Sequence, residues 1–329
     1  MPERVAFVEV GPAGGHRLVA GGLTVLERRV RELAKAGATR VVVAAEPVDF
    51  GRPLPVEVEF VGAGAAAPDD AERARGDVLA GVEVVDVASC KRAEWAVLRS
   101  MNKSFEGPVD ALINWRVSMR ITRQLAKTRL TPNHVTLVAI TVGVVASLLL
   151  LLRGDRLALA VAGVLLQLNS ILDSCDGELA RLRFQYSKLG QWLDNLSDDL
   201  VDNLFIASAG LMLGGVWAVL GVAAAGGRLF ASVVIYVLVY RRTGTGDVFA
   251  FRYWFESVDD TPDQIYDPTS ILTWIRAMGR RDTYVFTWMV VCLVGFAPWV
   301  VGHGLAISAV AVAMILAHLW KIRGQAATT

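Results

Sequence analysis

The chain has 329 residues, a net charge of +1, 54% hydrophobic residues and 20% charged residues. Its mean hydropathy of +0.45 is too high for an ordinary soluble protein of this length, and the apolar residues are concentrated after about residue 130. The near-neutral charge gives little support to nucleic-acid binding. Composition therefore favours a membrane protein.

The cysteines and the first residues argue against two further features. Cys90, Cys175 and Cys292 lie far apart and form no CxxC pair, so neither disulfides nor a zinc site is expected. The opening Met-Pro-Glu-Arg-Val lacks the charged and then apolar run of a secretory signal, so we expect no signal peptide. The cysteines are therefore not expected to form the functional site.

Residues 1–100 are predicted to form a small cytoplasmic α/β domain. Alternation of β-branched runs with a helical apolar pattern is typical of parallel strands in one layer. Residues 62–76, rich in Gly, Ala, Asp and Arg, are predicted to be a surface loop. The expected elements are strands at 5–10, 39–45, 56–61 and 82–87 and a helix at 26–36.

Residues 101–131 are predicted to be a linker and an interfacial amphipathic helix. Basic side chains alternate there with apolar ones, a pattern suited to the headgroup layer of an anionic leaflet. The step Thr131-Pro132-Asn133 breaks this helix, because proline disfavours helix at the preceding residue. The segment carries Trp115, Arg116, Arg120, Arg123, Lys127 and Arg129.

Residues 132–329 are predicted to form an all-α membrane bundle of six spanning helices. Lys and Arg are abundant in the connections expected on one side, whereas the other side carries only Arg153 and Arg156. The positive-inside rule then places both termini in the cytoplasm. The expected spans are 134–152, 157–175, 193–213, 216–240, 283–302 and 304–320, with outer turns at 153–156, near 214 and near 303.

Arg228 falls inside the fourth expected span. An intramembrane arginine is by default a functional hypothesis. Snorkelling, or pairing with a carboxylate for structural reasons, is an equally good explanation. The sequence leaves the two alternatives open.

Four aspartates are placed to meet at one point between the second and third spans. Asp173 and Asp176 are three residues apart and Asp194 and Asp198 four apart, so each pair shares a helix face. Carboxylates at a membrane boundary need a compensating cation. Oxygen ligands suit Mg²⁺, Mn²⁺ or Ca²⁺ rather than zinc, and Mg²⁺ held by carboxylates is typically a partner of substrate phosphates. The alternative is a solvated connection with accidental spacing.

The string Asp173-Ser-Cys-Asp176-Gly177-Glu-Leu-Ala180-Arg181, followed by Gly190, Asp194 and Asp198, resembles the signature of the CDP-alcohol phosphotransferase (CDP-alcohol phosphatidyltransferase) family. Every defined position of D-x2-D-G-x2-A-R-x8-G-x3-D-x3-D is met. The resemblance implies a six-helix membrane bundle, usually dimeric. It also implies transfer of a substituted phosphoryl group from a CDP-alcohol to a hydroxyl acceptor, with release of CMP.

The resemblance also implies roles for individual residues. Two metal ions, either Mg²⁺ or Mn²⁺, would bind the donor diphosphate. Asp198 would be the catalytic base. Asp199 lies one residue off the shared face and is not expected to be the base. The expected metal ligands are Asp173, Asp176, Asp194 and Asp198, and the expected donor-nucleotide residues are Asp173, Gly177, Ala180, Arg181 and Gly190.

A second resemblance concerns the N-terminal domain. The stretch from Gly21 to Val30 with the following Val-Val-Val run resembles the sugar-phosphate nucleotidyltransferase fold, but the domain is less than half the usual length and has no lysine before Lys35. The glycine-rich loop at 11–17 could bind an anion through backbone N–H groups, although Pro12 removes one donor. We therefore expect a degenerate domain with regulatory, assembly or scaffold duties.

The acceptor is expected to carry a phosphate. Guanidinium groups match phosphate geometry, and four arginines lie at the cytoplasmic ends of the fourth and fifth spans, although positive-inside anchoring explains them equally well. The segment 241–282 is expected to form interfacial helices. The lead-in 103–118 looks like that of family members that handle inositol phosphates, which favours a polyol phosphate acceptor. The tentative acceptor residues are Arg241, Arg242, Arg280 and Arg281.

Two other classes of function are compatible with acidic residues in a membrane protein. A divalent-cation transporter or channel would also place acids in a membrane, but at depth in several spans. A non-catalytic regulatory membrane protein is disfavoured by the intact motif. The expected partners are a CDP-alcohol, either CDP-diacylglycerol or a CDP-polyol, an alcohol acceptor, membrane lipid and a second copy of the chain, but no nucleic acid.

Overall fold

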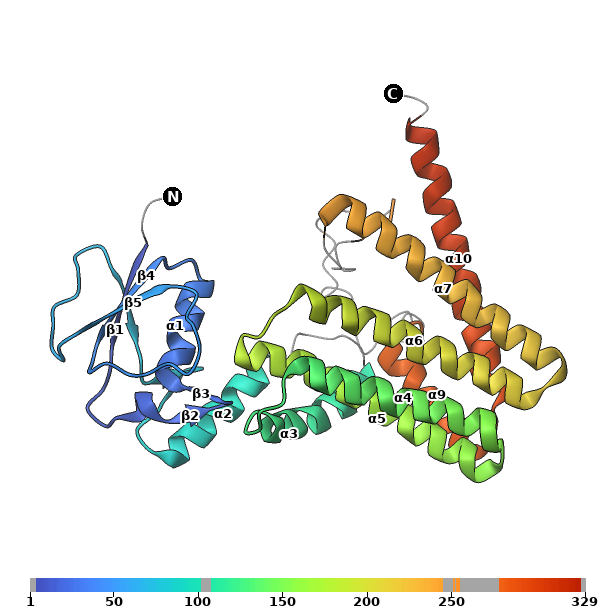
Figure 1. Cartoon of the computed structure of the whole chain (residues 1–329), viewed down its shortest axis with the longest axis horizontal. Coiled ribbons are helices and arrows are strands. Elements are labelled where there is room, and N and C mark those ends of the chain that lie inside the picture. Colours follow the sequence, from blue (N-terminus) through green and yellow to red (C-terminus); the bar gives the residue numbers. More distant parts are fainter. Residues whose placement is uncertain (1–3, 102–107, 245–250, 252, 255–277, 327–329) are drawn as a thin grey trace. The chain divides into compact units, whose positions relative to one another are not determined.

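The computed structural model describes residues 4–101, 108–244, 251, 253–254 and 278–326, with side chains as far as residue 321 (Figure 1). The chain is mostly helical, with a small α/β part at its N-terminal end. It divides into two compact units. Unit 1 comprises Met1–Lys103, Thr122–Leu130 and Glu178–Gln185, and unit 2 comprises Ser104–Ile121, Thr131–Gly177 and Tyr186–Thr329.

Unit 1 contains a four-stranded parallel sheet with the order β5-β4-β1-β6 (Figure 1). In its register, Val5 pairs with Arg40 and Arg40 pairs with Glu57. The strands of the sheet are β1 (Val5–Glu9), β4 (Arg40–Ala44), β5 (Glu57–Val61) and β6 (Glu72–Arg75). Two short antiparallel pairs join β2 (Val19–Ala20) to β3 (Leu23–Thr24) and β7 (Val78–Leu79) to β8 (Val82–Glu83).

Side-chain alternation along the strands creates two apolar faces. On one face, Ala6, Val8, Val41 and Val43 pack against Leu26, Val30 and Leu33 of α1 (Val25–Lys35). On the other, Phe7, Val42 and Ala44 pack against Ala67 and Ala71. Thr24 caps α1 by accepting the Glu27 N–H at 3.1 Å. A capping box of Asp86 and Ser89 begins α2 (Val87–Ser100).

The first three expected strands and the helix are confirmed, each within one residue at either end. The strand expected at 82–87 is wrong beyond Glu83, because Asp86 caps α2. The loop expected at 62–76 is wrong at its end, because Glu72–Arg75 form β6. This edge strand pairs through its backbone with β1, and its charged side chains give no apolar strand pattern.

A basic helix precedes the long helices, as expected. A π-helical turn, η2 (Asp110–Asn114), continues into α3 (Trp115–Leu125). The expected break follows, and α4 begins at Pro132 with Thr131 as its N-cap. Proline suits the first turn of a helix because its missing N–H would have no intrahelical partner there.

Four helices of the described chain are long and apolar enough to cross a membrane: α4, α5, α7 and α10. Two further helices, α6 and α9, are more polar or shorter: α6 carries four aspartates, and α9 has 14 residues. The bounds of these six helices are α4 (Pro132–Arg153), α5 (Arg156–Arg183), α6 (Lys188–Leu213), α7 (Gly215–Thr243), α9 (Arg281–Val294) and α10 (Pro298–Ala326).

The boundary expected between the last two spans is wrong. Residues 283–302 do not form one helix, because α9 ends at Val294 and α10 begins at Pro298. Gly295 adopts a left-handed conformation (φ 85°) after α9, and proline starts the next helix. The turn near 303 therefore lies at 295–297, whereas the expected turns at 153–156 and near 214 are confirmed by Gly154 and Gly214.

The connection between α5 and α6 is shorter than expected. The predicted spans end at 175 and begin again at 193, but α5 continues to Arg183 and α6 begins at Lys188. A polar residue can end an apolar span without ending the helix, because backbone hydrogen bonding continues regardless of side-chain polarity. The aspartates consequently lie within two helices rather than at their ends.

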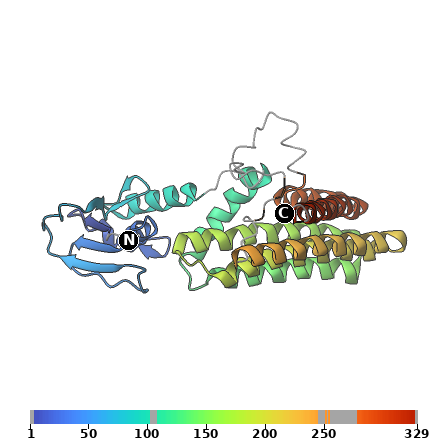
Figure 2. The ribbon, with the colours of Figure 1, turned by 90° about the horizontal axis from the view of Figure 1, so that it is seen from above.

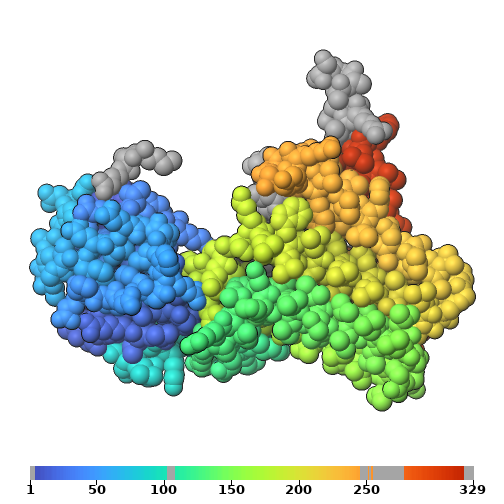
Figure 3. Space-filling model, viewed as in Figure 1, coloured from blue at the N-terminus to red at the C-terminus, as the bar shows by residue number. Residues whose placement is uncertain are grey.

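Close helix packing in unit 2 depends on small residues. α4, α5 and α6 run side by side (Figures 1 and 2), and side chains of α4, α6 and α7 form adjoining bands on one face of unit 2 (Figure 3). A Cβ on Gly143 of α4 would lie 2.4 Å from Val201 of α6, and one on Gly210 would lie 2.9 Å from the Cα of Gly221. Small residues allow such approach between membrane helices.

Candidate active site

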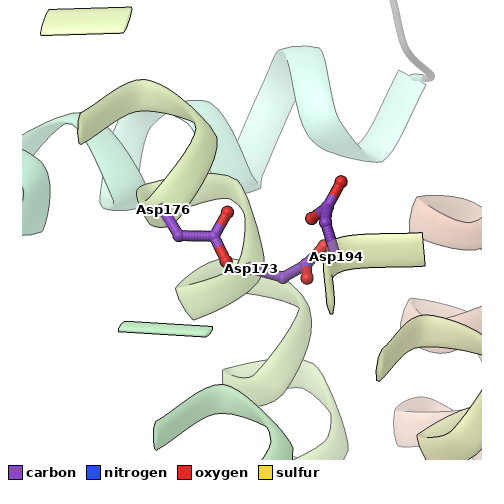
Figure 4. Close-up of side chains that lie close together, drawn as sticks. All are labelled: Asp173, Asp176 and Asp194. Atoms are coloured by element: carbon purple, nitrogen blue, oxygen red, sulfur yellow. The ribbon is translucent and has the colours of Figure 1, made fainter. Parts of the chain in front are cut away.

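Three aspartates from two helices gather their carboxylates in one place (Figure 4). Asp173 and Asp176 lie on α5 and Asp194 lies on α6, and one oxygen from each lies within 4.8 Å of the others. The three-residue spacing puts Asp173 and Asp176 on the same side of α5. Asp176 is buried, and the other two are half-buried. The expected convergence of the two helices is therefore present for three of the four acids.

Asp198, the fourth acid, is linked to Asp173 through Arg281. The Arg281 Nη1 donates to Asp173 Oδ2 at 2.9 Å and lies 2.7 Å from Asp198 Oδ1. Asp198 Oδ1 is buried and accepts no hydrogen bond from the described residues. Its contact with Arg281 is thus an ion pair without hydrogen-bond alignment. Asp198 shares the face of Asp194, one helical turn away.

Arg281 is half-buried at the start of α9, and it contacts oxygen atoms on α5 and α6. In addition to its contacts with Asp173 and Asp198, Arg281 has two others. Its Nη2 donates to Asn169 Oδ1 at 2.9 Å, and its Nε lies 3.5 Å from Asp202 Oδ1. The other three arginines proposed to bind the acceptor are exposed: Arg241, Arg242 and Arg280. Arg281 therefore differs from the other three arginines, because its side chain is half-buried and forms ion pairs with carboxylates.

A second ionic group lies one turn along α6 from Asp198. Asp202 is fully buried and forms an ion pair with Arg228 of α7 at 3.2 Å. The Tyr284 hydroxyl donates to Asp202 and accepts from Arg228 at 2.9 Å. Arg228 is thus paired with a carboxylate inside the bundle, one of the two alternatives that the sequence left open. Asp199 points to another partner, since it accepts the Tyr236 hydroxyl.

Two further side chains, which were not predicted from the sequence, position this site. The Thr136 hydroxyl on α4 donates to Asp176, and Asn169 on α5 holds Arg281 while its Nδ2 donates to the Ala139 carbonyl at 2.8 Å. Asn169 precedes Asp173 by four residues on an apolar helix, a spacing that could have identified it. Thr136 gave no such signal, because threonine is common in membrane helices.

Gly190 lies where a larger residue would not fit. A Cβ there would lie 2.9 Å from Ser187 Oγ and 3.2 Å from Asn133 Oδ1. Ser187 caps α6 by accepting the Gly190 N–H at 2.9 Å. The structure thus brings Asn133, directly after the Thr131-Pro132 break, close to the predicted nucleotide residue Gly190. The other predicted nucleotide residues, Gly177, Ala180 and Arg181, follow Asp176 along α5.

The glycine-rich loop of the N-terminal domain is closely packed. A Cβ on Gly15 would lie 1.6 Å from the Val84 carbonyl oxygen, and one on Gly11 would lie 2.3 Å from an Asp77 carboxylate oxygen. Burial, followed by the charge of Arg17, lowers the pKa of His16 in this loop. A neighbouring carboxylate repels an anion, so this surface is poorly suited to a triphosphate.

The carboxylate cluster fits a divalent metal ion. Its donors are oxygens, which Mg²⁺ and Mn²⁺ prefer, and the nearby Asp198 Oδ1 has only an ion pair with Arg281 and no hydrogen bond from the described residues. Most of the segment 241–282 lies outside the described residues, so its expected interfacial helices stay a prediction.

Comparison with known proteins gives the family. Residues 129–323 match the family model described as CDP-alcohol phosphatidyltransferase. The chain belongs to this family. The match covers the aspartate cluster, the helices from α4 to α9 and α10 as far as residue 323, so the cluster lies in the family's own domain.

Three curated relatives illustrate the similarity. The "Bifunctional IPC transferase and DIPP synthase" of Thermococcus kodakarensis is 37% identical over 40% of this chain and 29% of its own length. The protein of that name from Archaeoglobus fulgidus is 27% identical over 72% of this chain and 43% of its own length. The "Archaetidylinositol phosphate synthase" of Pyrococcus horikoshii is 35% identical over 30% of this chain and 48% of its own length. The chain thus spans less than half the length of each relative.

Proposed function

We propose that the protein is an integral-membrane CDP-alcohol phosphotransferase. It moves a substituted phosphoryl group from a CDP-alcohol to the hydroxyl of an acceptor alcohol and releases CMP. The observation that carries the proposal is the meeting of Asp173, Asp176 and Asp194 in the domain that matches the family. Such a reaction needs positioning and charge neutralisation more than covalent chemistry by the protein.

Asp173, Asp176, Asp194 and Asp198 would hold two Mg²⁺ or Mn²⁺ ions. These ions, when bound, neutralise charge on the donor diphosphate and on the leaving CMP. The contacts among the chain's own residues support this assignment: Thr136 fixes the Asp176 carboxylate, and Arg281 links Asp173 with Asp198. The acids are thereby held in place by side chains from α4 and α9.

Asp198 would take the proton from the acceptor hydroxyl. Its Oδ1 is held by an ion pair with Arg281 at 2.7 Å and accepts no hydrogen bond from the described residues, so no aligned donor of the protein competes with a substrate O–H for this carboxylate. Asp199, the neighbouring acid, is engaged by the Tyr236 hydroxyl and is a poorer candidate. Asp202 sits with Arg228 and Tyr284 and would support the site from one turn away.

Asp173, Gly177, Ala180, Arg181 and Gly190 would bind the donor nucleotide. The close approach of Asn133 to Gly190 supports a site in which no side chain at position 190 obstructs the ligand. Arg181 supports it further, because its Nε is buried and has no hydrogen-bond partner among the described residues. A guanidinium of this kind suits a phosphate oxygen.

Arg241, Arg242, Arg280 and Arg281 would bind a phosphorylated acceptor. Arg241 and Arg242 end α7, and Arg280 and Arg281 begin α9. The name of the Pyrococcus horikoshii relative includes the words inositol phosphate. This agrees with the lead-in at 103–118, which favours a polyol phosphate as acceptor. We accordingly propose inositol phosphate as the first acceptor to test, with CDP-diacylglycerol and CDP-inositol as donors.

We propose six membrane crossings in a multi-pass protein of the cytoplasmic membrane, with both termini and the active site cytoplasmic. The four helices that can span by length and composition support this topology, with α6 and α9 as the other two crossings. Many large apolar side chains of α7 and α10 are exposed, among them Phe230, Val233, Val310 and Leu316, which suits contact with lipid. A homodimer is proposed from the family resemblance.

We propose residues 1–100 as a truncated nucleotidyltransferase-like domain without nucleotidyl transfer activity, 101–131 as the linker and interfacial helix, and 132–329 as the phosphotransferase domain. The carboxylate beside the glycine-rich loop supports the first assignment. The aspartate motif and the family match lie together in the third region.

The test is Mg²⁺-dependent CMP release by purified protein given each donor with a panel of acceptors. Acceptor-dependent CMP formation is expected from at least one pair. Absence of CMP with every pair, accompanied by metal flux in liposomes, would refute the phosphotransferase and favour a cation transporter. Identification of the lipid or phosphodiester product by mass spectrometry would name both alcohols.

A further inference from the structure

Two segments near the motif fold together with the N-terminal domain rather than with unit 2. Thr122–Leu130 includes the end of α3, and Glu178–Gln185 includes the end of α5 with Ala180 and Arg181. All contacts described below lie within this one compact unit. The end of the motif helix is therefore part of the structure to which the α/β domain belongs.

The end of α5 adopts a conformation that is unusual for its sequence. Phe184 follows the helix with φ 54°, in the left-handed region that usually requires glycine. The Gln185 N–H donates to the Ala180 carbonyl and the Phe184 N–H donates to the Arg181 carbonyl, which is the Schellman pattern of helix termination. A bulky residue in this position persists when its surroundings hold it there.

Arg28 of α1 contacts this turn directly. Its side chain is 1% exposed, its Nη2 donates to the Leu182 carbonyl at 2.5 Å, and its guanidinium carbon lies 5.6 Å from the centre of the Phe184 ring. The last carbonyls of a helix have no intrahelical donor, and a cation is favourable at a helix C-terminus. Arg28 thus caps α5 and covers the strained residue in one contact.

The loop between β2 and β3 packs on the same two segments. Gly21 (φ 61°) and Gly22 (φ 80°) approach them so closely that a Cβ on Gly21 would lie 2.8 Å from the Leu182 side chain, and one on Gly22 would lie 2.6 Å from the Ala126 carbonyl oxygen. The Gly21 N–H donates to Glu94 Oε1 at 3.1 Å. Only glycine combines this conformation with this clearance.

Buried ionic groups join the two segments to the domain and to each other. Glu94 of α2 accepts from Arg123 Nε at 2.5 Å, and Arg123 lies over the Trp95 ring at 5.0 Å. Arg183, at the end of α5, donates to the carbonyls of Leu125, Ala126, Thr128 and Leu130. The domain and both helix ends thus share one polar network.

We propose that the N-terminal α/β domain is a positioning module for the cytoplasmic end of α5, and that Arg28 is its positioning residue for donor-nucleotide binding by Arg181. The proposal rests on the proposed function for its donor ligand. Arg28 acts through the backbone of Leu182 and the ring of Phe184, one and three residues after Arg181. The domain thereby has a role in phosphotransfer that requires no nucleotidyltransferase chemistry.

The test compares Arg28→Gln with Arg31→Gln in the purified full chain. Arg31 is a matched control, because it is a buried arginine of the same helix that bonds Glu27 and the Pro53 carbonyl. For Arg28→Gln we expect the KM for the CDP-alcohol to rise about tenfold or more, as for loss of a hydrogen bond from a charged group, with kcat little changed. Arg31→Gln should leave this KM unchanged.

Two rescues test the route by which Arg28 acts. Arg28→Lys keeps a cation at the helix end and should recover part of the loss in KM. Phe184→Gly, introduced into Arg28→Gln, removes the need to hold a bulky residue at positive φ and should also lower the KM. An equal rise in KM for Arg28→Gln and Arg31→Gln, or none for either, would overturn the proposal.

Hydrogen exchange separates failure of this proposal from failure of the proposed function. Amide protection over 178–187 should fall in Arg28→Gln and not in Arg31→Gln, whether or not the protein turns over any donor. If the wild-type protein releases no CMP, the phosphotransferase function is refuted and the exchange pattern alone decides whether Arg28 fixes α5. Unchanged protection in Arg28→Gln would overturn the positioning role.

Discussion

Arg281 and Asp173 form an ion pair at 2.9 Å that joins the first residue of α9 to the middle of α5. The same guanidinium nitrogen lies 2.7 Å from Asp198 on α6. One cation from a helix distant in the sequence therefore compensates carboxylates on the two consecutive helices α5 and α6. The contact makes the start of α9 part of the candidate active site.

Replacement of Arg281 by Gln should destabilise the protein, because Asp173 and Asp198 would lose their shared cation. Loss of one partner from a largely buried ion pair costs about 3 kcal/mol, or a fall in Tm on the order of 5 °C. Thermal unfolding in detergent without added metal measures the effect. Added Mg²⁺ should raise the Tm of Arg281→Gln more than that of the wild type, since the metal would neutralise the same carboxylates.

Arg280→Gln provides the control for this experiment, because it removes the same charge from the adjacent, exposed position. It should change the Tm little, as exposed charges contribute little to stability. Equal Tm values for Arg281→Gln and Arg280→Gln would contradict the structural account of Arg281.

Asp202 and Arg228 should show strong energetic coupling. Asp202→Asn and Arg228→Met each leave one charged partner buried among α6, α7 and α9, which costs about 3–5 kcal/mol. The double variant should lose much less than the sum of the two, because neither charge remains. A double-mutant cycle from denaturation in mixed micelles measures the coupling, and additive losses would show that the two residues act independently.

Gly190→Ala should weaken donor binding. The new methyl group would press on Ser187 Oγ and Asn133 Oδ1, while alanine itself favours a helix over glycine. We expect the KM for the CDP-alcohol to rise about tenfold with an unchanged helix content, as a displacement of the ligand by a methyl group costs about 1–3 kcal/mol. Gly226→Ala is the matched control, because nothing lies within 4 Å of its added Cβ. A KM that changes equally in both variants would argue against a ligand at Gly190.

Much of the fold could be predicted because hydrophobic patterning was strong. The uncharged run in α4 and the glycines at 154 and 214 define helices and turns by composition alone. The α9–α10 boundary was mistaken because Gly295 and Pro298 lie inside a long apolar run, where hydropathy does not change across the turn. In β6, by contrast, charged side chains concealed a strand held by its backbone.

The candidate site was predictable to the extent that its residues are close in sequence. Asp173 with Asp176, and Asp194 with Asp198, share helix faces by spacing alone. The contacts of Arg281, Thr136 and Arg28 could not be predicted, because each depends on how distant helices pack. Arginine at a helix end fits anchoring, phosphate binding or ion pairing equally well in the sequence, and only the packing distinguishes them.

The aspartate cluster is proposed to carry out phosphoryl transfer with Asp198 as the base. The most direct measurement is CMP formation by Asp198→Asn under conditions in which Mn²⁺ and CDP-alcohol binding are measured on the same sample. Both ligands should still bind, and turnover should fall by a factor of about 10²–10⁴, as expected for loss of a general base. Substantial CMP formation by Asp198→Asn with both ligands bound would contradict this role of Asp198.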